Sequence, residues 1–361
     1  MQKTRTAEPR DLRLLRVIAC LLFALSSNVG AGRAQAADDA APPIAISFPR
    51  DDGPHLALTE WWYYTGHLET ADGRLYGFEQ VTFKAIRGFA SGYAAHVAIT
   101  DPGRQRFAYD QRAVYDDGTI AKFGAGFDFT IGDWSMRGVN GVDELAMTIS
   151  GYSYVLSLIS QKPPVLHGGD GYLRTDAGAE SYYYSRTRLS VTGMITVDGV
   201  VSAVTGAAWM DHQWGGFTSF SVAGWDWFSI QLDDGTEVMI YQLRDELDSR
   251  SLLVATYVRA DGTSVDLTEN DLDVSIDEVW RSPESLAIYP AAWTIRFPSA
   301  NLELTLAPTV ANQELDTRET TGVTYWEGQV LVSGTKADVP IEGRGYVELT
   351  GYARGRDGVV P

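Results

Sequence analysis

One segment of the sequence occurs twice, and this internal repeat constrains the fold more than any other feature. The first copy begins at Trp61-Trp62-Tyr63-Tyr64 and the second at Trp225-Asp226-Trp227-Phe228. Each copy continues into an Asp-Gly turn, and the alignment across that turn pairs Gln80 with Gln242. The repeat therefore predicts a duplicated chain whose two halves share one fold.

The ends of the two halves also match. Gly206 to Asp211 and Gly343 to Glu348 both follow the pattern Gly-x-x-aromatic-x-carboxylate. Residues two apart in a strand share a face, so each half is expected to hold an acid beside a large ring. If the halves pack with their pockets facing each other, Asp211 and Glu348 share one cavity. If each half encloses its own interior, the two acids are merely equivalent.

Short alternating apolar and polar runs dominate the chain after its first residues. They are rich in β-branched and aromatic residues, and Asp-Gly dipeptides such as Asp72-Gly73 and Asp198-Gly199 separate them. Regular short strands joined by Asp-Gly turns are typical of antiparallel hairpins in barrels and sandwiches. We expect an all-β protein of two consecutive antiparallel barrels, at 48–218 and 219–357, with the boundary near residues 216 to 222.

The first 36 residues have the composition of a secretory signal peptide. Basic residues precede an apolar core at 17–25, and Ala34-Gln35-Ala36 forms a small-x-small cleavage site. The apolar core is shorter than the roughly 20 residues that span a bilayer. We expect cleavage after Ala36, a linker at 37–47, and a periplasmic or secreted mature chain without a transmembrane segment.

The single cysteine and the net charge further limit the kinds of protein that this sequence can encode. Cys20 lies inside the signal segment, so we expect no disulfide in the mature protein. Val17-Ile18-Ala19-Cys20 is similar to a lipoprotein cleavage box, but the apolar stretch continues beyond it, which favours a soluble exported protein. The net charge of −18 repels phosphate backbones, which argues against nucleic acid as a partner.

The densest group of chemically capable residues is the segment from Trp209 to Gly215. Asp211 lies between indoles, where partial desolvation raises the pKa of a carboxyl group toward values that suit a proton donor. His212 is expected on the opposite face of the strand. A structural alternative remains open, in which Asp211 accepts hydrogen bonds from backbone amides at the junction of the two halves.

Other familiar catalytic patterns do not occur in the sequence. The five histidines lack metal-ligand spacing, so a metal site would have to be assembled from distant strands. We also find no Gly-x-Ser-x-Gly motif and no phosphate-binding loop. The sequence predicts neither a metal nor a cofactor.

These motifs resemble those of the carotenoid 1,2-hydratases (hydroxyneurosporene synthases) and of the secreted AttH-like proteins. The similarity covers about residues 48 to 353. Its motifs are Glu60 to Leu68, Gly77-Phe78-Glu79, His96-Val97-Ala98, Ser181 to Ser185, Trp209 to Gly215, Tyr325 to Gly328 and Gly345 to Tyr352. The resemblance implies two tandem lipocalin-like domains.

The resemblance also implies an apolar pocket and two functional hypotheses. The first is an exported protein that binds or hands over a hydrophobic small molecule, either alone or as an accessory of an ABC transporter permease complex. The second is a hydratase, isomerase or cyclase with Asp211 as proton donor and His212 or Tyr184 as its partner. The residues expected to contact the ligand are Trp61, Tyr63, His67, Glu79, His96, Tyr182, Trp209, Trp214, Trp225, Trp227, Tyr346 and Glu348.

Overall fold

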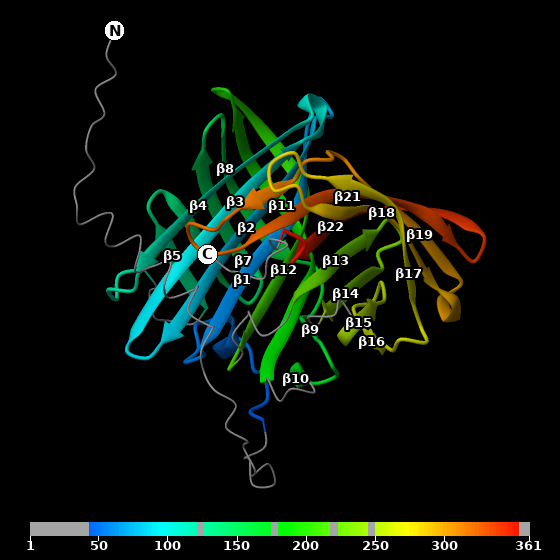
Figure 1. Cartoon of the computed structure of the whole chain (residues 1–361), viewed down its shortest axis with the longest axis horizontal. Coiled ribbons are helices and arrows are strands. Elements are labelled where there is room, and N and C mark those ends of the chain that lie inside the picture. Colours follow the sequence, from blue (N-terminus) through cyan, green and yellow to red (C-terminus); the bar gives the residue numbers. More distant parts are fainter. Residues whose placement is uncertain (1–42, 121–125, 175–179, 217–222, 245–249, 354–361) are drawn as a thin grey trace.

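The computed structural model describes residues 43–120, 126–174, 180–216, 223–244 and 250–353. These residues form two antiparallel sheets that curve into neighbouring barrel-like units (Figure 1). The first sheet contains β1 (Thr59–Thr70), β2 (Leu75–Arg87), β3 (Ala90–Asp101), β4 (Arg106–Tyr115), β5 (Phe127–Ile131), β6 (Trp134–Val139), β7 (Val142–Ile149), β8 (Tyr152–Ser160), β9 (Val165–Leu166), β10 (Tyr172–Arg174), β11 (Glu180–Val197) and β12 (Val200–Gly215). The all-β expectation is confirmed.

The second sheet follows in the chain and repeats the strand order of the first. It contains β13 (Gly224–Leu232), β14 (Glu237–Arg244), β15 (Arg250–Val258), β16 (Ser264–Leu267), β17 (Asp273–Arg281), β18 (Ile288–Phe297), β19 (Leu302–Pro308), β20 (Glu314–Asp316), β21 (Thr324–Lys336) and β22 (Val339–Thr350). The first sheet runs β4-β3-β2-β1-β12-β11-β8-β7-β6-β5, and the second runs β16-β15-β14-β13-β22-β21-β19-β18-β17. The two orders match strand by strand except for β5.

The ladder registers make the duplication explicit. Tyr63 of β1 pairs with Asp211 of β12, and Trp227 of β13 pairs with Glu348 of β22. The alignment of Gln80 with Gln242 is wrong by two residues. Gln80 pairs with Tyr64, whereas the residue equivalent to Tyr64 in the second sheet is Phe228, which pairs with Ile240. The two hairpins differ in length on both sides of the turn. The sequence alignment allowed only for the difference before the turn, so it is out of register after it.

Strand β1 is buried on both faces, and this property creates three cores instead of two. Trp62 and Tyr64 fill the first barrel, while Tyr63 belongs to a separate cluster that also contains Trp227 and Tyr346 of the second sheet. The second barrel has its own core, which includes Phe228 and Trp293. The outer faces of the two sheets therefore pack against each other, and this inter-barrel face is closed by large aromatic side chains.

Some predictions concern residues outside the described part of the chain. These are the signal peptide at 1–36 with Cys20, the first part of the linker, and most of the boundary near 216 to 222. Among the described residues the helices are short 3-10 turns, such as η1 (Arg50–Asp52), and none has the length and apolar character that crossing a membrane requires.

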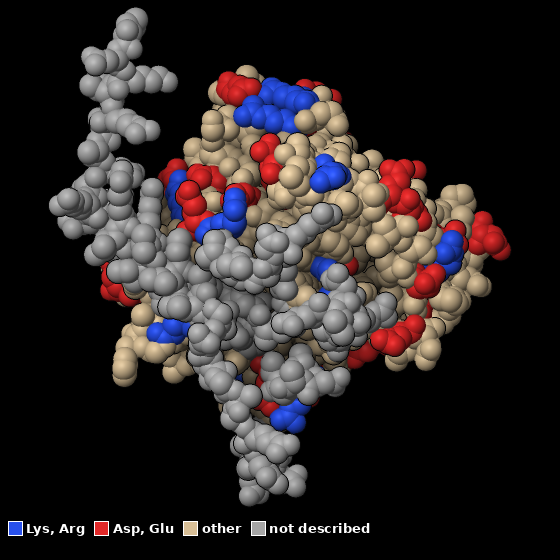
Figure 2. All heavy atoms as spheres, in the orientation of Figure 1, with Lys and Arg blue, Asp and Glu red and all other residues tan. Residues whose placement is uncertain are grey.

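The surface reflects the acidic composition. Figure 2 shows Asp and Glu side chains spread around the edges of the viewed face, with Lys and Arg in a few small groups between them. Several of the cations are paired with neighbouring acids, as in the exposed ion pair of Arg137 and Glu144. On this face the described residues form no continuous basic surface that would attract a polyanion.

Candidate functional site

The residues predicted as a site divide into two groups on opposite faces of the first sheet. Asp211 faces the second barrel, whereas its neighbour His212 lies inside the first barrel together with Tyr184. The three residues predicted as catalytic therefore do not come together. The alternation of a regular strand, which the sequence analysis expected for His212, explains this separation.

The first group is an inter-barrel acid cluster made of Glu79, Asp211, Glu327 and Glu348. Each acid comes from a different strand, namely β2, β12, β21 and β22. Glu79, Asp211 and Glu327 are at least 97% buried, and Glu348 is half-buried. Eight further residues of the predicted set lie on the same face, namely Trp61, Tyr63, His67, His96, Trp209, Trp225, Trp227 and Tyr346. Asp211 and Glu348 thus share one interface, as the facing arrangement of the two halves requires.

Burial shifts the acids of this cluster toward their neutral forms. It raises the pKa of Glu79 to about 8, with a further contribution from the negative charge of Glu348. Burial and the charge of Glu348 raise the pKa of Glu327 well above its ordinary value. The pKa of Glu348 rises to about 7, because burial outweighs the hydrogen bond from Trp225. Near neutral pH the cluster therefore retains protons that exposed carboxyl groups would have lost.

The partners of Glu79, Glu327 and Glu348 are neutral hydroxyl and indole groups. Tyr63 donates its hydroxyl proton to Glu327 Oε1 over 2.7 Å, and the Trp225 indole donates to Glu348 Oε2 over 2.9 Å. Among the described residues, Oε2 of Glu79 and Oε2 of Glu327 are buried without a hydrogen-bond partner. Such orphaned oxygens are rare in folded proteins, and each calls for an explanation such as a catalytic role or a bound water.

Asp211 differs from the other acids because it accepts three hydrogen bonds. Tyr183 and Ser185 donate to it over 2.5 Å each, and the indole of Trp209 donates over 2.6 Å. Burial raises the pKa of Asp211, but these donors partly offset that effect and leave the pKa at about 6. Asp211 is therefore the member of the cluster that ionises first.

A chain of hydrogen-bonding groups leads from Asp211 toward the surface. Ser185 contacts Nε2 of His167 at 2.7 Å, and Nδ1 of His167 lies 2.9 Å from the hydroxyl of Thr256. That hydroxyl lies 3.3 Å from Oδ1 of Asp266, which is exposed. The chain crosses from β11 to β15, and it offers Asp211 a route for proton exchange with solvent.

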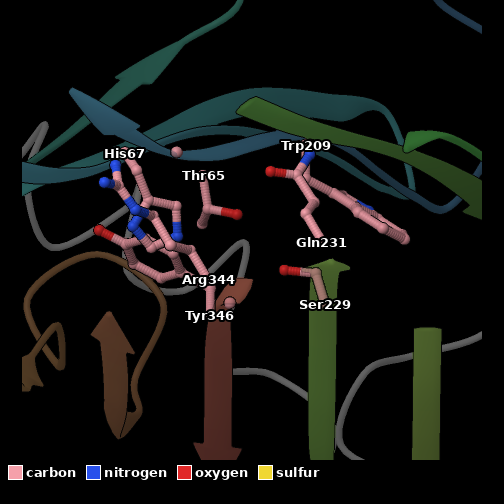
Figure 3. Close-up of a pocket in the computed structure, with 9 residues that line it drawn as sticks. Thr65, His67, Trp209, Ser229, Gln231, Arg344 and Tyr346 are labelled. Carbon is pink, nitrogen blue, oxygen red and sulfur yellow. The ribbon is translucent and has the colours of Figure 1, made fainter. Parts of the chain in front are cut away.

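A small pocket lies beside the acid cluster, and both barrels line it (Figure 3). Thr65 and His67 come from β1, while Ser229 and Tyr346 come from the second sheet. The pocket has room for about one water molecule. The hydroxyl oxygen of Thr65 is buried without a partner among the described residues, so a water bound here would satisfy it.

The histidines on the inter-barrel face are neutral hydrogen-bonding groups. Burial, assisted by the charge of Arg344, lowers the pKa of His67 to about 3, and its Nδ1 accepts a hydrogen bond from Gln329 over 2.8 Å. Burial also lowers the pKa of His96 to about 3, and this ring bridges the hydroxyls of Tyr325 and Thr320. Neither histidine supplies a positive charge to the acids.

The second group is a barrel-end histidine cluster made of His55, Glu60 and His212. Nδ1 of His55 lies 2.7 Å from Glu60 Oε1, and Nε2 of His212 lies 3.0 Å from the same oxygen. Burial alone would raise the pKa of Glu60, but hydrogen bonds from His212 and His55 outweigh it and lower the pKa to about 2. This carboxylate is ionised at every pH at which the protein is expected to work.

The remaining predicted residues surround this second cluster. The ring of His55 stacks on Trp214 at 3.9 Å, and Tyr182 stacks on the same indole at 5.3 Å. Tyr184 lies 3.4 Å from Nδ1 of His212 and donates its proton to Asp52 over 2.8 Å. Tyr184 and Trp214 therefore contact the histidine cluster, and Tyr182 packs behind Trp214 on the same face, away from the acid cluster.

Sequence reasoning missed three residues of these clusters, His55, Glu60 and Glu327, and also His167, which lies in the hydrogen-bond chain from Asp211. Glu327 has no acidic counterpart in the first half. Glu327 pairs with Glu348 in the second sheet, and at the equivalent position of the first sheet Ser185 pairs with Asp211. A search by repeat alone cannot find Glu327, but its spacing from Tyr325 places both on one strand face. His55 precedes β1, where no strand pattern gives it a direction.

Comparison with known proteins agrees with this architecture. The AttH-like family model matches residues 39–352. A Nitrosomonas europaea protein described as an AttH (NE1406) is 34% identical, with a TM-score of 0.78, over 86% of this chain and 98% of its own. Kievitone hydratase of Nectria haematococca shares the fold at 16% identity, with a TM-score of 0.68, over 85% of this chain and 93% of its own.

A third structure, CghA with Sch210972, has 14% identity and a TM-score of 0.55 over 87% of this chain and 95% of its own. No curated protein matches the chain in sequence. The family match spans the repeat, both barrels and both clusters. The chain therefore belongs to the AttH-like family.

Proposed function

We propose that this protein is a proton-transferring enzyme of the hydratase or isomerase type that acts on an apolar substrate at the inter-barrel acid cluster. The observation that carries the proposal is a set of four acids on the inter-barrel face, of which three are buried and Glu348 is half-buried. The pKa of Glu79 is raised to about 8, that of Glu348 to about 7, and that of Glu327 well above its ordinary value. Among the described residues the hydrogen-bond partners of these three acids are hydroxyl and indole groups and not cations. Acids with a pKa near the working pH make efficient proton donors.

The environments of the acids suggest separate roles. Glu327 has a free buried oxygen and the stronger tendency to hold its proton, which suits a donor. Asp211 accepts three hydrogen bonds and ionises more easily, which suits an acceptor. This assignment replaces Asp211 as the proton donor with Glu327, since divergent environments separate an acid from a base.

In a hydration, Glu327 would transfer its proton to one carbon of a double bond, and water would add to the resulting cation. The added water would lose a proton to Asp211, so that the net change is the addition of one water to the substrate. Asp211 would release its proton through Ser185, His167 and Thr256, and Glu327 would regain one from solvent. Rings such as Trp209 and Trp227 would stabilise the cation through their π faces.

The rim of the acid cluster suggests how an apolar substrate enters. Trp61, Phe83, Trp225 and Leu252 are only partly buried and pack against the edge of the inter-barrel core. Displacement of these side chains would admit an apolar molecule without exposing the acids to bulk water. A hydratase name among the structural neighbours supports this reaction class, although that similarity concerns the fold.

Binding without turnover is the second candidate function, and the same apolar rim favours it. In that case the protein would bind or hand over a hydrophobic small molecule. An accessory role beside an ABC transporter permease, and export through residues 1–36, remain predictions from the sequence.

The test begins with native mass spectrometry and organic extraction of the protein purified from the cells that produce it naturally. Each co-purifying apolar molecule is then incubated with the protein in water enriched in oxygen-18, and separately in deuterium oxide. A hydratase incorporates oxygen-18 and also deuterium, an isomerase incorporates deuterium alone, and a carrier incorporates neither.

Three variants assign the chemistry to residues. We expect Glu327→Gln and Asp211→Asn to fold and to bind the molecule but to lose the label. The surface variant Glu144→Gln serves as the matched control and should keep it, because Glu144 is exposed. Unchanged labelling by Glu327→Gln and Asp211→Asn would contradict the proposed roles, and unfolding of Asp211→Asn would favour its structural role at the junction.

A further inference from the structure

The barrel-end histidine cluster brings three potential metal ligands together from separate parts of the chain. The ligand atoms of His55, Glu60 and His212 all lie within 4.8 Å of one another. His55 precedes β1, Glu60 is the second residue of β1, and His212 lies on β12. The spacing of these residues in the sequence gives no sign of a metal site, because the barrel alone assembles it.

This cluster has more close nitrogen–oxygen contacts than it has protons to make them hydrogen bonds. Both nitrogens of His55 face carboxylate oxygens, Glu60 Oε1 at 2.7 Å and Asp51 Oδ1 at 3.2 Å. A neutral imidazole has one N–H group, and an ionised carboxylate only accepts hydrogen bonds. One of the two contacts of His55 therefore has no proton unless the ring carries a positive charge.

His212 has the same shortage. Its Nε2 lies 3.0 Å from Glu60 Oε1, and its Nδ1 lies 3.4 Å from the hydroxyl of Tyr184. Tyr184 gives its own proton to Asp52 over 2.8 Å, so its oxygen can only accept from His212. To make every contact a hydrogen bond, His55 and His212 would both have to be imidazolium ions that donate to the same oxygen of Glu60.

We propose that His55 Nδ1, His212 Nε2 and Glu60 Oε1 bind a divalent first-row transition-metal ion of the Zn²⁺ class. An ion among these atoms removes the shortage of protons, because the nitrogen of each ring that faces Glu60 then binds the ion. Each ring needs only one N–H group, on its outer nitrogen, the nitrogen that points away from Glu60. The outer nitrogens already face Asp51 and the Tyr184 hydroxyl, and metal-bound histidines usually direct their other N–H toward such groups. Two imidazoles and one carboxylate are a known ligand set for zinc.

The surroundings hold the ligands in place and leave one side open. His55 stacks on Trp214 at 3.9 Å with an interplanar angle of 3°, and His212 stacks on Trp62 at 4.5 Å. Lys84 lies 3.4 Å from Glu60 Oε2, which leaves Oε1 as the single coordinating oxygen. The His55 side chain is 21% exposed, so water can complete the coordination from this side.

The positive and negative groups around the site are balanced. Asp51 is paired with Arg50, and Asp52 is paired with Arg186 over 2.8 Å. Lys84 is the nearest cation, and its repulsion weakens the binding of a second positive charge. Two nitrogen ligands and one anionic oxygen bind the ion and offset this repulsion. Without an ion, the same contacts would require two imidazolium ions in the same space.

The test uses the full mature chain after treatment with a chelator and dialysis. CoCl₂ is the probe, because tetrahedral Co²⁺ absorbs visible light strongly, and ZnCl₂ is used for calorimetry and for displacement. We expect binding of one ion per chain, the visible spectrum of a nitrogen and oxygen site, and its loss when Zn²⁺ is added. Absence of binding at millimolar CoCl₂ and ZnCl₂ would overturn the proposal.

Variants locate the ion. His55→Gln should abolish the Co²⁺ spectrum, and Asp51→Asn should weaken Co²⁺ binding by about 10- to 100-fold through the outer nitrogen of His55. His96→Gln is the matched control, because His96 lies on the inter-barrel face, and it should keep the spectrum. Retention of the spectrum by His55→Gln would contradict the site.

A measurement on the unmodified protein covers the case in which a variant fails to fold. Co²⁺ shifts the proton resonances of its ligands far from their usual positions. We expect two strongly shifted, solvent-exchangeable imidazole N–H signals in the Co²⁺ protein, one each from His55 and His212. A bound Co²⁺ ion with no such signals would show adventitious binding elsewhere and would overturn the assignment.

Discussion

Asp211 and His212 are adjacent in the sequence, yet they serve two regions with opposite electrostatic character. In the inter-barrel acid cluster, carboxyl groups face hydroxyls and indoles, and burial raises their pKa values. In the barrel-end histidine cluster, Glu60 faces His55, His212 and Lys84, and its pKa falls to about 2. Glu60 and Glu327 are equally buried, so the partners and not the burial decide which of them is ionised.

The largest expected effect is the contrast between Glu60→Gln and Glu327→Gln in stability. Glu60→Gln removes a buried charge and leaves Lys84 and two histidines without their anion, which should lower the free energy of unfolding by about 3–5 kcal/mol. Glu327→Gln replaces a neutral acid by an amide of the same shape and should cost less than about 1 kcal/mol. Urea unfolding at pH 7 measures both values.

This pair of variants can break the comparison directly, since each changes one fully buried glutamate to glutamine. Equal losses of stability would show that Glu327 is ionised like Glu60. A loss of several kcal/mol for Glu327→Gln, without a similar loss for Glu60→Gln, would show that Glu327 is the ionised glutamate and Glu60 the neutral one.

The next effect is the dependence of stability on pH. The folded-state pKa values of Glu79 and Glu348, about 8 and about 7, lie above the ordinary value of 4.5. Between pH 4.5 and these values the folded state binds more protons than the unfolded state, so the free energy of unfolding falls as the pH rises. Each group contributes a slope of about 1.4 kcal/mol per pH unit at most.

The two clusters should therefore respond to pH with opposite signs. Glu60, with a folded pKa of about 2, contributes stability above pH 4.5 that is lost as the pH falls toward 2. Urea unfolding of the wild type and of Glu348→Gln between pH 5 and 8 isolates the acid cluster. We expect a smaller negative slope in the variant up to about pH 7, and an unchanged slope would contradict the raised pKa of Glu348.

The smallest expected effect concerns an ion pair outside both clusters. Arg137 and Glu144 face each other on the surface, with side chains 59% and 50% exposed. Arg137→Gln should change the free energy of unfolding by less than about 0.5 kcal/mol, because solvent screens exposed pairs. A loss of stability comparable to that of Glu60→Gln would show that burial does not decide how much an ion pair contributes to the free energy of unfolding.

Much of the architecture follows from the sequence. Alternating runs and Asp-Gly turns predict the strands, and the repeat predicts that Asp211 and Glu348 occupy equivalent positions. Alternation also predicts that Asp211 and His212 point in opposite directions. These are local properties of a strand, and they hold wherever the strand is regular.

The site itself was only partly accessible to sequence reasoning. Glu327 joins the acids because β21 and β2 meet across the interface, and no pattern within one half shows how two barrels pack. His55 reaches Glu60 from the segment that contains η1, whose course depends on Asp51 and its partners. The catalytic grouping of Asp211 with His212 or Tyr184 came from the family resemblance. Strand alternation places Asp211 on one face of the sheet and both of these residues on the other.

The central claim is that the pKa values of the acid cluster are raised toward neutral pH, and two indoles report on two of its acids. Trp225 donates to Glu348 and Trp209 donates to Asp211, so their indole N–H resonances should shift as these carboxyls ionise. A pH titration of the nitrogen-15 labelled protein by NMR, assigned with Glu348→Gln and Asp211→Asn, should give midpoints near 7 and near 6. Midpoints at or below about 4 for both indoles would show ordinary ionised carboxylates and would contradict the account.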